Sequence, residues 1–254
     1  MTDLFSLAGR TAMITGGSRG IGRMIAAGFL RAGARVYITA RKAEACIATA
    51  KELSALGPCT ALPHDIATPE GLQALVADLT AREPALDILV NNAGAAWGAP
   101  FDEFPEAGWD KVMDLNVKTP FFLTQALHAA LKAGGRERPA KVINIASIDG
   151  LSVNPMETYS YAASKAGLVH LTKRMALRLV DDNIVVSAIA PGAFASDMNR
   201  DARDHGDAVA QRIPARRIGT DEDMAGAAIY LASRAGDYVV GATLTVDGGV
   251  TLAR

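Results

Sequence analysis

Short apolar runs alternate with longer helical stretches along the chain. The runs at residues 87–92 and 184–189 are almost continuously apolar. Such runs are typical of strands that are buried on both faces of a parallel sheet. The pattern predicts strands at 11–15, 35–40, 60–65, 87–92, 141–146, 184–189 and 243–246. It predicts helices at 21–32, 43–56 and 69–83, and long helices before the strands at 141 and 184.

The order of these elements predicts the fold class. Strands alternate with helices of roughly 10–15 residues, which is the pattern of an α/β fold. We therefore predict a doubly wound parallel sheet of the Rossmann type, with ligands beyond the carboxyl ends of the strands. No linker or change in composition divides the chain, so residues 1–254 are expected to form a single domain.

Local signals add detail to this order. Pro63 weakens the third strand because proline cannot donate a ladder hydrogen bond. Thr68 followed by Pro69 is typical of a helix start, and residues 220–223 have the pattern of a capping box. Asn144, inside an apolar strand, is expected to be a hydrogen-bonded core amide. Residues 132–141, rich in Gly and Arg, are expected to be a solvated loop.

Composition and charge exclude several classes of function. The chain is 50% hydrophobic with a formal net charge of −1, and it lacks the basic stripe of a nucleic-acid-binding protein. No run of about 18 apolar residues predicts a membrane span, and residues 1–10 do not resemble a secretory signal. Cys46 and Cys59 form no disulfide framework, and the four histidines have no metal-ligand spacing. We expect a cytoplasmic protein with no metal, nucleic-acid or membrane partner.

Tyr161 and Lys165 are the first candidates for catalytic chemistry. They are four residues apart in a predicted helix, so their side chains share one face. An ammonium within about 4–6 Å favours the phenolate, so Lys165 is expected to lower the pKa of the Tyr161 phenol from about 10. Ser147 lies fourteen residues before Tyr161 and could hold a carbonyl oxygen beside the phenol. A core tyrosine and a solvated lysine are the alternative interpretation.

A glycine-rich turn joins the first predicted strand to the first predicted helix. Residues 15–22 have the spacing G-x-x-x-G-x-G. Gly16 permits the tight turn, Gly20 lets the backbone approach a pyrophosphate, and Gly22 lets the helix pack on the strand. The N–H groups and dipole of a helix N-terminus favour phosphate, so this turn predicts a dinucleotide site.

The end of the second predicted strand indicates which dinucleotide binds. NAD-binding proteins usually have a carboxylate about 20 residues after the glycine turn, whereas this chain has Ala40, Arg41 and Lys42 there. Arg41, with Arg19 of the turn, could clamp a 2′-phosphate through hydrogen bonds worth roughly 1.5–3 kcal/mol each. We predict NADP(H) rather than NAD(H); two solvated surface arginines are the alternative.

Together with several further motifs, these features resemble the short-chain dehydrogenase/reductase family over essentially the whole chain. The matching motifs are the turn at 15–22, Asn91-Asn92-Ala93-Gly94, Asn116, Ser147, Tyr161 with Lys165, Pro191-Gly192 and Asp247-Gly248-Gly249. Within the family, the chain most resembles the 3-oxoacyl-thioester (β-ketoacyl) reductases. Residues 5–10, 43–46 and Trp97-Gly98 are similar to the ketoacyl reductase type of rhamnolipid biosynthesis.

The resemblance implies four catalytic residues. Tyr161 would protonate the carbonyl oxygen as a hydride arrives from the nicotinamide. Lys165 would lower the pKa of Tyr161 and hold the nicotinamide ribose. Ser147 would bind the carbonyl oxygen where negative charge develops. Asn116 would hold a water molecule that links Lys165 to solvent.

The resemblance also implies a set of cofactor contacts. Asp65 and Ile66 would lie beside the adenine, and residues 92–94 beside its ribose. Phe194 would meet the nicotinamide amide through its backbone, and Ser196 would face the phosphates. The family more often has isoleucine or valine, and threonine, at these last two positions. The full set is Gly16, Ser18, Arg19, Gly20, Ile21, Gly22, Arg41, Asp65, Ile66, Asn92, Ala93, Gly94, Tyr161, Lys165, Pro191, Gly192, Phe194 and Ser196.

The substrate is less constrained by the sequence. Pocket walls are expected at 95–98, 148–158 and 194–214, and a charged lid at 197–206. The apolar wall residues suit an acyl chain or a ring: Trp97, Leu151, Val153, Pro155 and Met156. Four arginines could meet a phosphopantetheine group or could simply be solvated: Arg200, Arg203, Arg216 and Arg217.

We expect NADPH-dependent reduction of a small-molecule ketone, first of all a 3-oxoacyl thioester. A reductase or dehydrogenase of a sugar, cyclic alcohol or steroid-like compound is the first alternative. A non-catalytic NADP-binding sensor is the second, but such a module need not keep Ser147, Asn116, Tyr161 and Lys165 together. The resemblance also implies a homotetramer.

Overall fold

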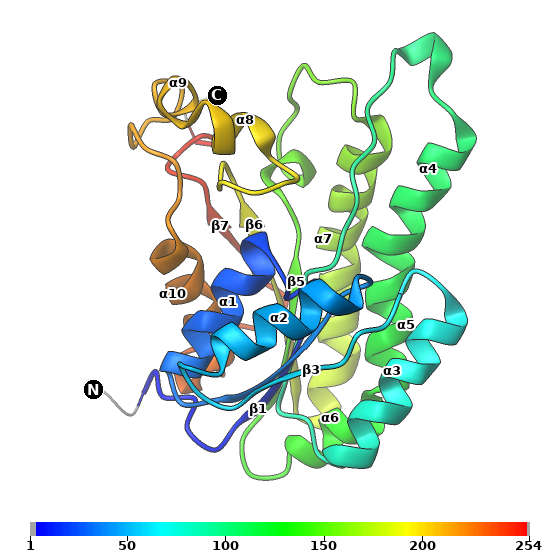
Figure 1. Ribbon diagram of the computed structural model, residues 1–254, viewed down its shortest axis with the longest axis vertical. Coiled ribbons are helices and arrows are strands. Elements are labelled where there is room, and N and C mark those ends of the chain that lie inside the picture. The colour runs from blue at the N-terminus through cyan, green and yellow to red at the C-terminus, as the bar shows by residue number, and fades with distance from the viewer. Residues whose placement is uncertain (1–3, 253–254) are drawn as a thin grey trace.

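A computed structural model describes residues 4–252, and a seven-stranded sheet runs through its centre (Figure 1). The strands are β1 (Thr11–Thr15), β2 (Arg35–Thr39), β3 (Cys59–Ala61), β4 (Ile88–Asn91), β5 (Ala140–Ile145), β6 (Ile184–Pro191) and β7 (Thr243–Val246). Their order is β3-β2-β1-β4-β5-β6-β7, and all the pairings are parallel. The strand order therefore reverses between β1 and β4, where doubly wound sheets bind ligands. The predicted fold class is confirmed.

Helices cover both faces of this sheet. They are α1 (Gly20–Arg31), α2 (Ala43–Leu53), α3 (Pro69–Arg82), α4 (Glu106–Met113), α5 (Thr119–Ala126), α6 (His128–Gly134), α7 (Tyr159–Leu179), α8 (Arg200–Asp204), α9 (Gly206–Ala210) and α10 (Asp221–Ala232). In Figure 1, α1, α2 and α10 lie on one side of the sheet and α3, α5 and α7 on the other. The short α8 and α9 lie beyond the end of β6.

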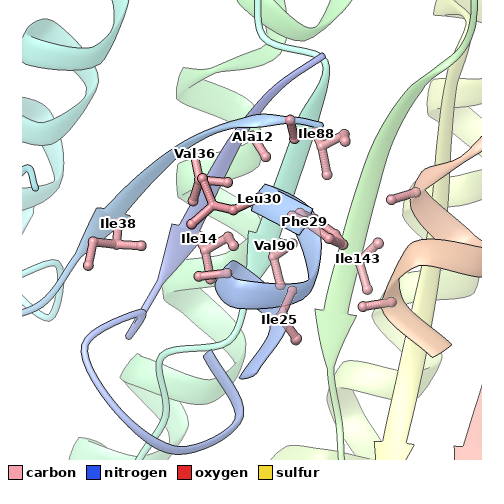
Figure 2. Close-up of a cluster of buried hydrophobic side chains, with 14 of the residues drawn as sticks. Ala12, Ile14, Ile25, Phe29, Leu30, Val36, Ile38, Ile88, Val90 and Ile143 are labelled. Atoms are coloured by element: carbon pink, nitrogen blue, oxygen red, sulfur yellow. The ribbon is translucent and has the colours of Figure 1, made fainter. Parts of the chain in front are cut away.

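The sheet is apolar because both of its faces are covered. All residues of β1, β4, β5 and β6 are buried. Figure 2 shows Ile25 and Phe29 of α1 packed toward Ile14, Val90 and other strand residues of the same cluster. Each such side chain contributes roughly 1.5–3 kcal/mol when fully buried, so this cluster fixes α1, and with it the glycine turn, on the sheet.

Two helix starts follow the predicted signals. The Thr68 hydroxyl accepts a hydrogen bond from the Gly71 amide at 3.1 Å, and Pro69 opens α3. Thr220 and Asp223 form a reciprocal capping box at the start of α10. These side chains satisfy backbone donors that a helix leaves unpaired at its first turn.

Two predicted elements are shorter in the structure. The third strand is Cys59–Ala61 rather than 60–65, because Pro63 cannot donate to the ladder. The second helix ends at Leu53 rather than at residue 56. There the Ser54 hydroxyl donates to the Ala50 and Cys59 carbonyl oxygens, a local side-chain bond that competes with helix continuation.

The predicted solvated loop at 132–141 is wrong at both ends. α6 continues through Gly134, where a side chain would collide with the Leu86 carbonyl oxygen. At the other end, Lys141 belongs to β5 and is 1% exposed. Its ammonium lies 2.7 Å from the Asp237 carboxylate, and this pairing allows a lysine inside the sheet. Local composition did not reveal this long-range partner.

Within residues 4–252, no helix is long and apolar enough to cross a membrane. The same residues contain no cluster of three His, Cys, Asp or Glu side chains suited to a metal ion.

Candidate active site

The predicted catalytic residues meet beyond the carboxyl end of β5. Ser147 follows this strand, while Tyr161 and Lys165 lie in the first turns of α7. The alanine-rich, glycine-containing sequence around them continues as a 21-residue helix, as the spacing predicted. Ser147 is 7% exposed and Lys165 is 5% exposed, so the reacting groups are largely shielded from water.

Lys165 is a buried cation without a carboxylate partner in the described chain. Its ammonium donates a 2.7 Å hydrogen bond to the Ile145 carbonyl oxygen, at the end of β5. It also lies 5.6 Å from the centre of the Tyr161 ring. Burial lowers the pKa of Lys165 to about 8, because the charged form loses hydration. This lysine is therefore held next to the tyrosine but close to its own titration at physiological pH.

The predicted lowering of the pKa of Tyr161 is wrong. Burial raises the pKa of Tyr161 to about 12, and the Asp149 carboxylate adds to the rise. The Ser147 hydroxyl opposes it, since its hydrogen bond to the phenol lowers the pKa. The prediction from the sequence included the charge of Lys165 but not the desolvation of the buried phenol. Tyr161 is consequently a protonated phenol at physiological pH.

Asn116 lies in a π-helical turn, Asp114–Lys118, between α4 and α5. Such turns widen a helix and often occur at functional sites. The Asn116 side chain accepts a hydrogen bond from the Ala95 amide at 2.8 Å and donates to the Ala95 carbonyl and the Ser164 hydroxyl at 2.9 Å each. Ser164 in turn donates to the Tyr161 carbonyl at 2.8 Å. Asn116 thus ties the loop after β4 to the catalytic helix, while the water molecule proposed for it stays a prediction.

The segment after Ser147 packs closely on α7. Residues Ile148–Gly150 form a 3₁₀ turn, and the Ser147 hydroxyl accepts a 3.1 Å hydrogen bond from the Asp149 amide. A side chain at Gly150 would lie 2.6 Å from the Lys165 backbone. This close contact holds Ser147 and Asp149 beside the helix that carries Tyr161 and Lys165.

The glycine turn has the geometry of a phosphate cradle. Gly16 and Gly20 adopt φ of 64° and 52°, which disfavour a side chain. A side chain at Gly22 would lie 2.4 Å from the Gly16 carbonyl oxygen, so only glycine allows this closeness between turn and helix. The next residues of the chain form the buried, apolar part of α1. The turn is thus shaped by its backbone, and it leads directly into the helix N-terminus, where backbone N–H groups can bind phosphate.

The N-terminus of α1 is left without a cap. Arg19 makes no side-chain hydrogen bond there, and the first turn has no acidic residue. By contrast, α3 and α10 are capped by threonine, although α2, α4 and α7 also begin without a side-chain cap. An uncapped helix start with a positive dipole end fits a pyrophosphate. These features of the glycine turn and of α1 match the requirements of a dinucleotide.

Asn92 connects the turn to the neighbouring strand end. Its side-chain amide donates to the Thr15 carbonyl at 2.8 Å and to that of Gly16 at 3.2 Å. The Thr15 hydroxyl accepts hydrogen bonds from the Asn92 and Ala93 amides, each at 2.9 Å. The ends of β1 and β4 are therefore fixed together at the switch point, where residues 92–94 were predicted to meet the cofactor.

The two arginines predicted to clamp a 2′-phosphate differ in their surroundings. Arg41 is exposed just beyond β2, and the described residues provide no carboxylate partner for it within salt-bridge distance. Arg19 is instead paired with Asp197, at 2.5 Å. Asp197 also binds Arg203 at 2.7 Å, and both arginines lower the pKa of Asp197. Arg19 would have to leave this pair in order to bind a phosphate.

The remaining predicted cofactor residues lie around the same edge of the sheet. Ile66 is buried after β3, and Asp65 is half-buried beside it. Pro191 ends β6 and Gly192 follows it, while Phe194 is buried and bridges to Gly219. A side chain at Gly20 would lie 3.2 Å from Ser196, so the segment after β6 reaches the glycine turn. Ser18 and Ile21 belong to that turn and to the start of α1.

Aromatic side chains line the loops outside the catalytic group. Tyr159 makes edge-to-face contacts with Phe101 at 5.6 Å and with Phe104 at 5.7 Å between ring centres. The Glu157 carboxylate accepts hydrogen bonds from the Phe101 amide and the Tyr159 hydroxyl, each at 3.2 Å. The loop after β4 is thus joined to the loop before α7. Leu151, Val153 and Met156 are exposed on that second loop.

The predicted lid at 197–206 contains two short helices, α8 and α9. One of its two arginines, Arg203, pairs with Asp197 and Asp204. Arg217, farther along, pairs with Asp223 of the capping box. These contacts support the solvated interpretation of Arg203 and Arg217 more than a role in binding phosphopantetheine.

Sequence reasoning missed three polar residues near the site. Asp149 was included only in a general pocket wall, although a carboxylate two residues after Ser147 was a readable signal. Ser164 lies inside the tyrosine–lysine motif and could have been tested as a hydroxyl one helical turn from Tyr161. The pairing of Asp197 with Arg19 joins residues 178 positions apart and has no local signal.

Comparison with known proteins identifies relatives over nearly the whole chain. A family described as enoyl-(acyl carrier protein) reductase matches residues 16–251. The rhamnolipids biosynthesis 3-oxoacyl-[acyl-carrier-protein] reductase of Pseudomonas aeruginosa is 47% identical and aligns over 99% of this chain and 100% of its own.

Two solved structures are similar in fold as well as sequence. The Pseudomonas aeruginosa RhlG/NADP active-site complex has a TM-score of 0.95 and 47% identity, covering 99% of this chain and 100% of that chain. A gluconate 5-dehydrogenase from Burkholderia cenocepacia in complex with NADP and tartrate has a TM-score of 0.91 and 36% identity, covering 100% and 99%. The relatives therefore include enzymes of two substrate classes.

Proposed function

Because the chain belongs to the short-chain dehydrogenase/reductase family, we propose that it reduces 3-oxoacyl thioesters to 3-hydroxyacyl thioesters with NADPH. That the protein is an oxidoreductase of this family agrees with the sequence prediction. The resemblance to ketoacyl reductases of the rhamnolipid type is also confirmed by a relative of that description at 47% identity.

One observation carries the catalytic part of this proposal. A buried ammonium, a protonated phenol and a serine hydroxyl meet at one strand end, and the ammonium has no carboxylate to neutralise it in the described chain. A dry, positive, proton-donating site stabilises negative charge as it develops on a carbonyl oxygen. A purely structural tyrosine and lysine would not need this arrangement.

The cofactor fits the residues at the switch point. Two glycines with positive φ, the uncapped start of α1 and the exposed Arg41 provide a phosphate cradle and a cation for a 2′-phosphate. The prediction of NADP(H) agrees with similar structures that contain NADP. When bound, the reduced nicotinamide supplies the hydride.

The chain's own residues bind the carbonyl oxygen of the substrate and transfer a proton to it. The Ser147 hydroxyl donates a hydrogen bond to the substrate carbonyl oxygen and holds it next to the Tyr161 hydroxyl. Tyr161 transfers its proton to that oxygen, and the Lys165 ammonium stabilises the phenolate that remains. Asn116 keeps the loop after β4 and the catalytic helix in register, through Ala95 and Ser164. In the family, a water chain at this asparagine would return the proton.

The outer loops favour an acyl substrate. Val153 is 91% exposed and Met156 is 65% exposed on the loop that follows Ser147 and precedes α7. Apolar side chains exposed beside a reaction site suit an alkyl chain better than a polyol.

Reduction of a sugar or sugar acid is the second candidate. Gluconate 5-dehydrogenase of Gluconobacter oxydans is 36% identical over 99% of this chain, so relatives of that class are also present. The non-catalytic sensor has less support, because all four predicted catalytic residues are present and three of them are largely buried.

The proposal is tested by NADPH oxidation with 3-oxoacyl thioesters of several chain lengths, beside 5-keto-gluconate. We expect thioester turnover that falls by about 10²- to 10⁴-fold in Tyr161→Phe, since the proton donor is lost. Turnover of 5-keto-gluconate alone would overturn the proposed substrate. NADPH binding without turnover of any carbonyl compound would favour the sensor.

The assembly and location are further parts of the proposal. The homotetramer is implied by the family, and a monomeric mass in light scattering would contradict it. The cytoplasmic location and the boundaries of the single domain at 1–254 stay predictions from the sequence.

A further inference from the structure

The pocket wall next to the catalytic residues carries a carboxylate that the proposed reaction does not use. Asp149 is the second residue after Ser147, and its amide donates to the Ser147 hydroxyl at 3.1 Å. The next residue, Gly150, packs against the backbone of Lys165. Asp149 is therefore half-buried between Ser147, which follows β5, and Gly150, which packs on the first turns of α7.

The orientation of this carboxylate is fixed by a neutral partner. The Asn154 side-chain amide donates to it at 2.6 Å. Asn154 is itself held by the Met156 amide, which donates to its side-chain oxygen at 2.7 Å. Both partners come from the loop before α7, so the loop and the carboxylate are positioned together. An amide orients a carboxylate but leaves its charge in place.

No cation neutralises Asp149 in the described part of the chain. None of the salt bridges found between residues 4 and 252 includes it. The nearest cation along α7, Lys165, donates to the Ile145 carbonyl oxygen instead. The field of Asp149 nevertheless reaches the reaction site, because it contributes to the raised pKa of Tyr161. A half-buried negative charge thus acts on the Tyr161 phenol from the side of the pocket wall, while the Lys165 ammonium lies 5.6 Å from the centre of the Tyr161 ring.

We propose that Asp149 is a specificity-determining residue that excludes carbonyl compounds with a negative charge near the reacting carbonyl. The site would accept neutral esters, thioesters and ketones, and it would disfavour 3-oxo acids and keto-sugar acids. This inference deepens the proposed function, because it states which class of carbonyl compound the same site takes.

The expected size of the discrimination follows from charge repulsion. Two unit charges roughly 8–10 Å apart, in surroundings with an effective dielectric constant near 20, repel enough to change a rate or binding constant by about 10- to 30-fold. A 3-oxo acid places its carboxylate two bonds from the reacting carbon, well inside that range. A thioester places its distant charges in solvent, where screening removes most of the effect.

The test compares an ester and its acid, which differ at the reacting end only in charge. NADPH oxidation is measured with methyl acetoacetate and with acetoacetate, for the wild type and for Asp149→Asn, which keeps the shape and the partner Asn154. We expect the ratio of kcat/KM for acid over ester to rise about tenfold in the variant. The ester serves as the internal reference for any change in Tyr161. An unchanged ratio would overturn the proposal.

Further variants keep the outcome interpretable. Asp102→Asn removes an exposed carboxylate from the neighbouring loop and should leave the ratio as in the wild type. If Asp149→Asn does not bind NADPH, Asp149→Ser is used in its place. If the wild type does not turn over acetoacetate, its inhibition constant against the ester gives the same ratio.

The two proposals fail separately. Loss of thioester turnover together with a shifted acid-to-ester ratio would overturn the proposed substrate and keep the role of Asp149. Thioester turnover with an unchanged ratio would overturn the role of Asp149 alone.

Discussion

Two buried lysines lie at opposite ends of the same strand, and their surroundings differ. Lys141, near the start of β5, is 1% exposed, and its ammonium is 2.7 Å from the Asp237 carboxylate. Lys165, on α7, is 5% exposed and reaches the last carbonyl of β5. One buried charge has a counter-charge and the other has a peptide dipole.

The polar groups at the amino and carboxyl edges of the sheet differ in the same way as the two lysines. At the amino edge, Arg10 pairs with Asp87 at 3.2 Å and also donates to the Asp87 and Pro139 carbonyl oxygens. The Asp87 carboxylate in turn accepts a hydrogen bond from the Thr11 amide at 2.7 Å. The polar groups of this edge bind one another, so they hold the strand ends together and leave little for a ligand.

At the carboxyl edge, polar groups are left for a ligand. The start of α1 has no cap, whereas α10 begins with a complete capping box and three acidic residues. Lys165 has no carboxylate partner, and desolvation lowers its pKa to about 8. The comparison teaches that burial alone does not mark a functional charge. A buried charge indicates a functional site when the protein provides no counter-charge for it.

The strongest test exchanges both lysines for the same uncharged residue. Lys165→Met should lower kcat/KM by about 10³-fold, because the cation that stabilises the phenolate is lost. Lys141→Met should keep activity close to that of the wild type. NADPH oxidation by the two purified variants measures this difference. Equal losses of activity would mean that both lysines act through stability.

The paired edge should control stability instead. Asp237→Ala leaves the Lys141 ammonium buried without a partner, so the free energy of unfolding should fall by about 3 kcal/mol. Urea denaturation followed by circular dichroism measures it. Glu52→Ala is the matched control. Both side chains of the Glu52–Arg23 ion pair are exposed, so the pair contributes less than about 1 kcal/mol. A loss for Asp237→Ala no larger than for the control would contradict a structural role for the Lys141–Asp237 pair.

The pH dependence of activity should report Lys165. Its pKa of about 8 lies below the ordinary lysine value of 10.5, so the active ammonium is lost as the pH rises through 8. Tyr161 stays protonated, because its pKa is about 12. We expect kcat/KM for ketone reduction to fall about tenfold per pH unit above 8. A profile that is flat from pH 7 to 10 would contradict this assignment.

Stability should change in the opposite direction over the same range. Between pH 8 and 10.5 the unfolded chain holds a proton on Lys165 that the folded chain has lost, so folding becomes more favourable as the pH rises. Below pH 8 both states hold the proton, and the cost of the buried charge is fully present. Lys165→Met should remove this rise in the free energy of unfolding.

The smallest effect is expected at the pair of Arg19 with Asp197. Asp197→Asn frees Arg19 for a 2′-phosphate, and exposed pairs are worth at most about 1 kcal/mol, so NADPH should bind up to about fivefold more tightly. Binding of NADH, which has no 2′-phosphate, should not change. Fluorescence titration with both cofactors measures the two constants. If NADPH and NADH both bind more tightly, Asp197 acts on a portion of the dinucleotide that the two cofactors share.

Much of the site could be predicted from particular residues. Tyr161 and Lys165 share a helix face because four residues make about one turn, and α7 confirms this placement. The glycine turn was predicted correctly between β1 and α1, since its residue types require positive φ and close packing. The pKa of Tyr161 was predicted in the wrong direction, because desolvation depends on what covers the phenol and not on its neighbour along the helix.

The sequence by itself determined the order of strands and helices, the turn that suits a phosphate, and the residue types that meet at the strand ends. These are local consequences of hydrophobic period, glycine geometry and helical spacing. Only the tertiary structure decided which charges are neutralised. Asp237 reaches Lys141, Asp197 reaches Arg19, and Asp149 meets Asn154 but no cation in the described chain. Electrostatic interactions depend on distance through space and on exclusion of water. Neither quantity can be derived from the spacing of residues along the chain.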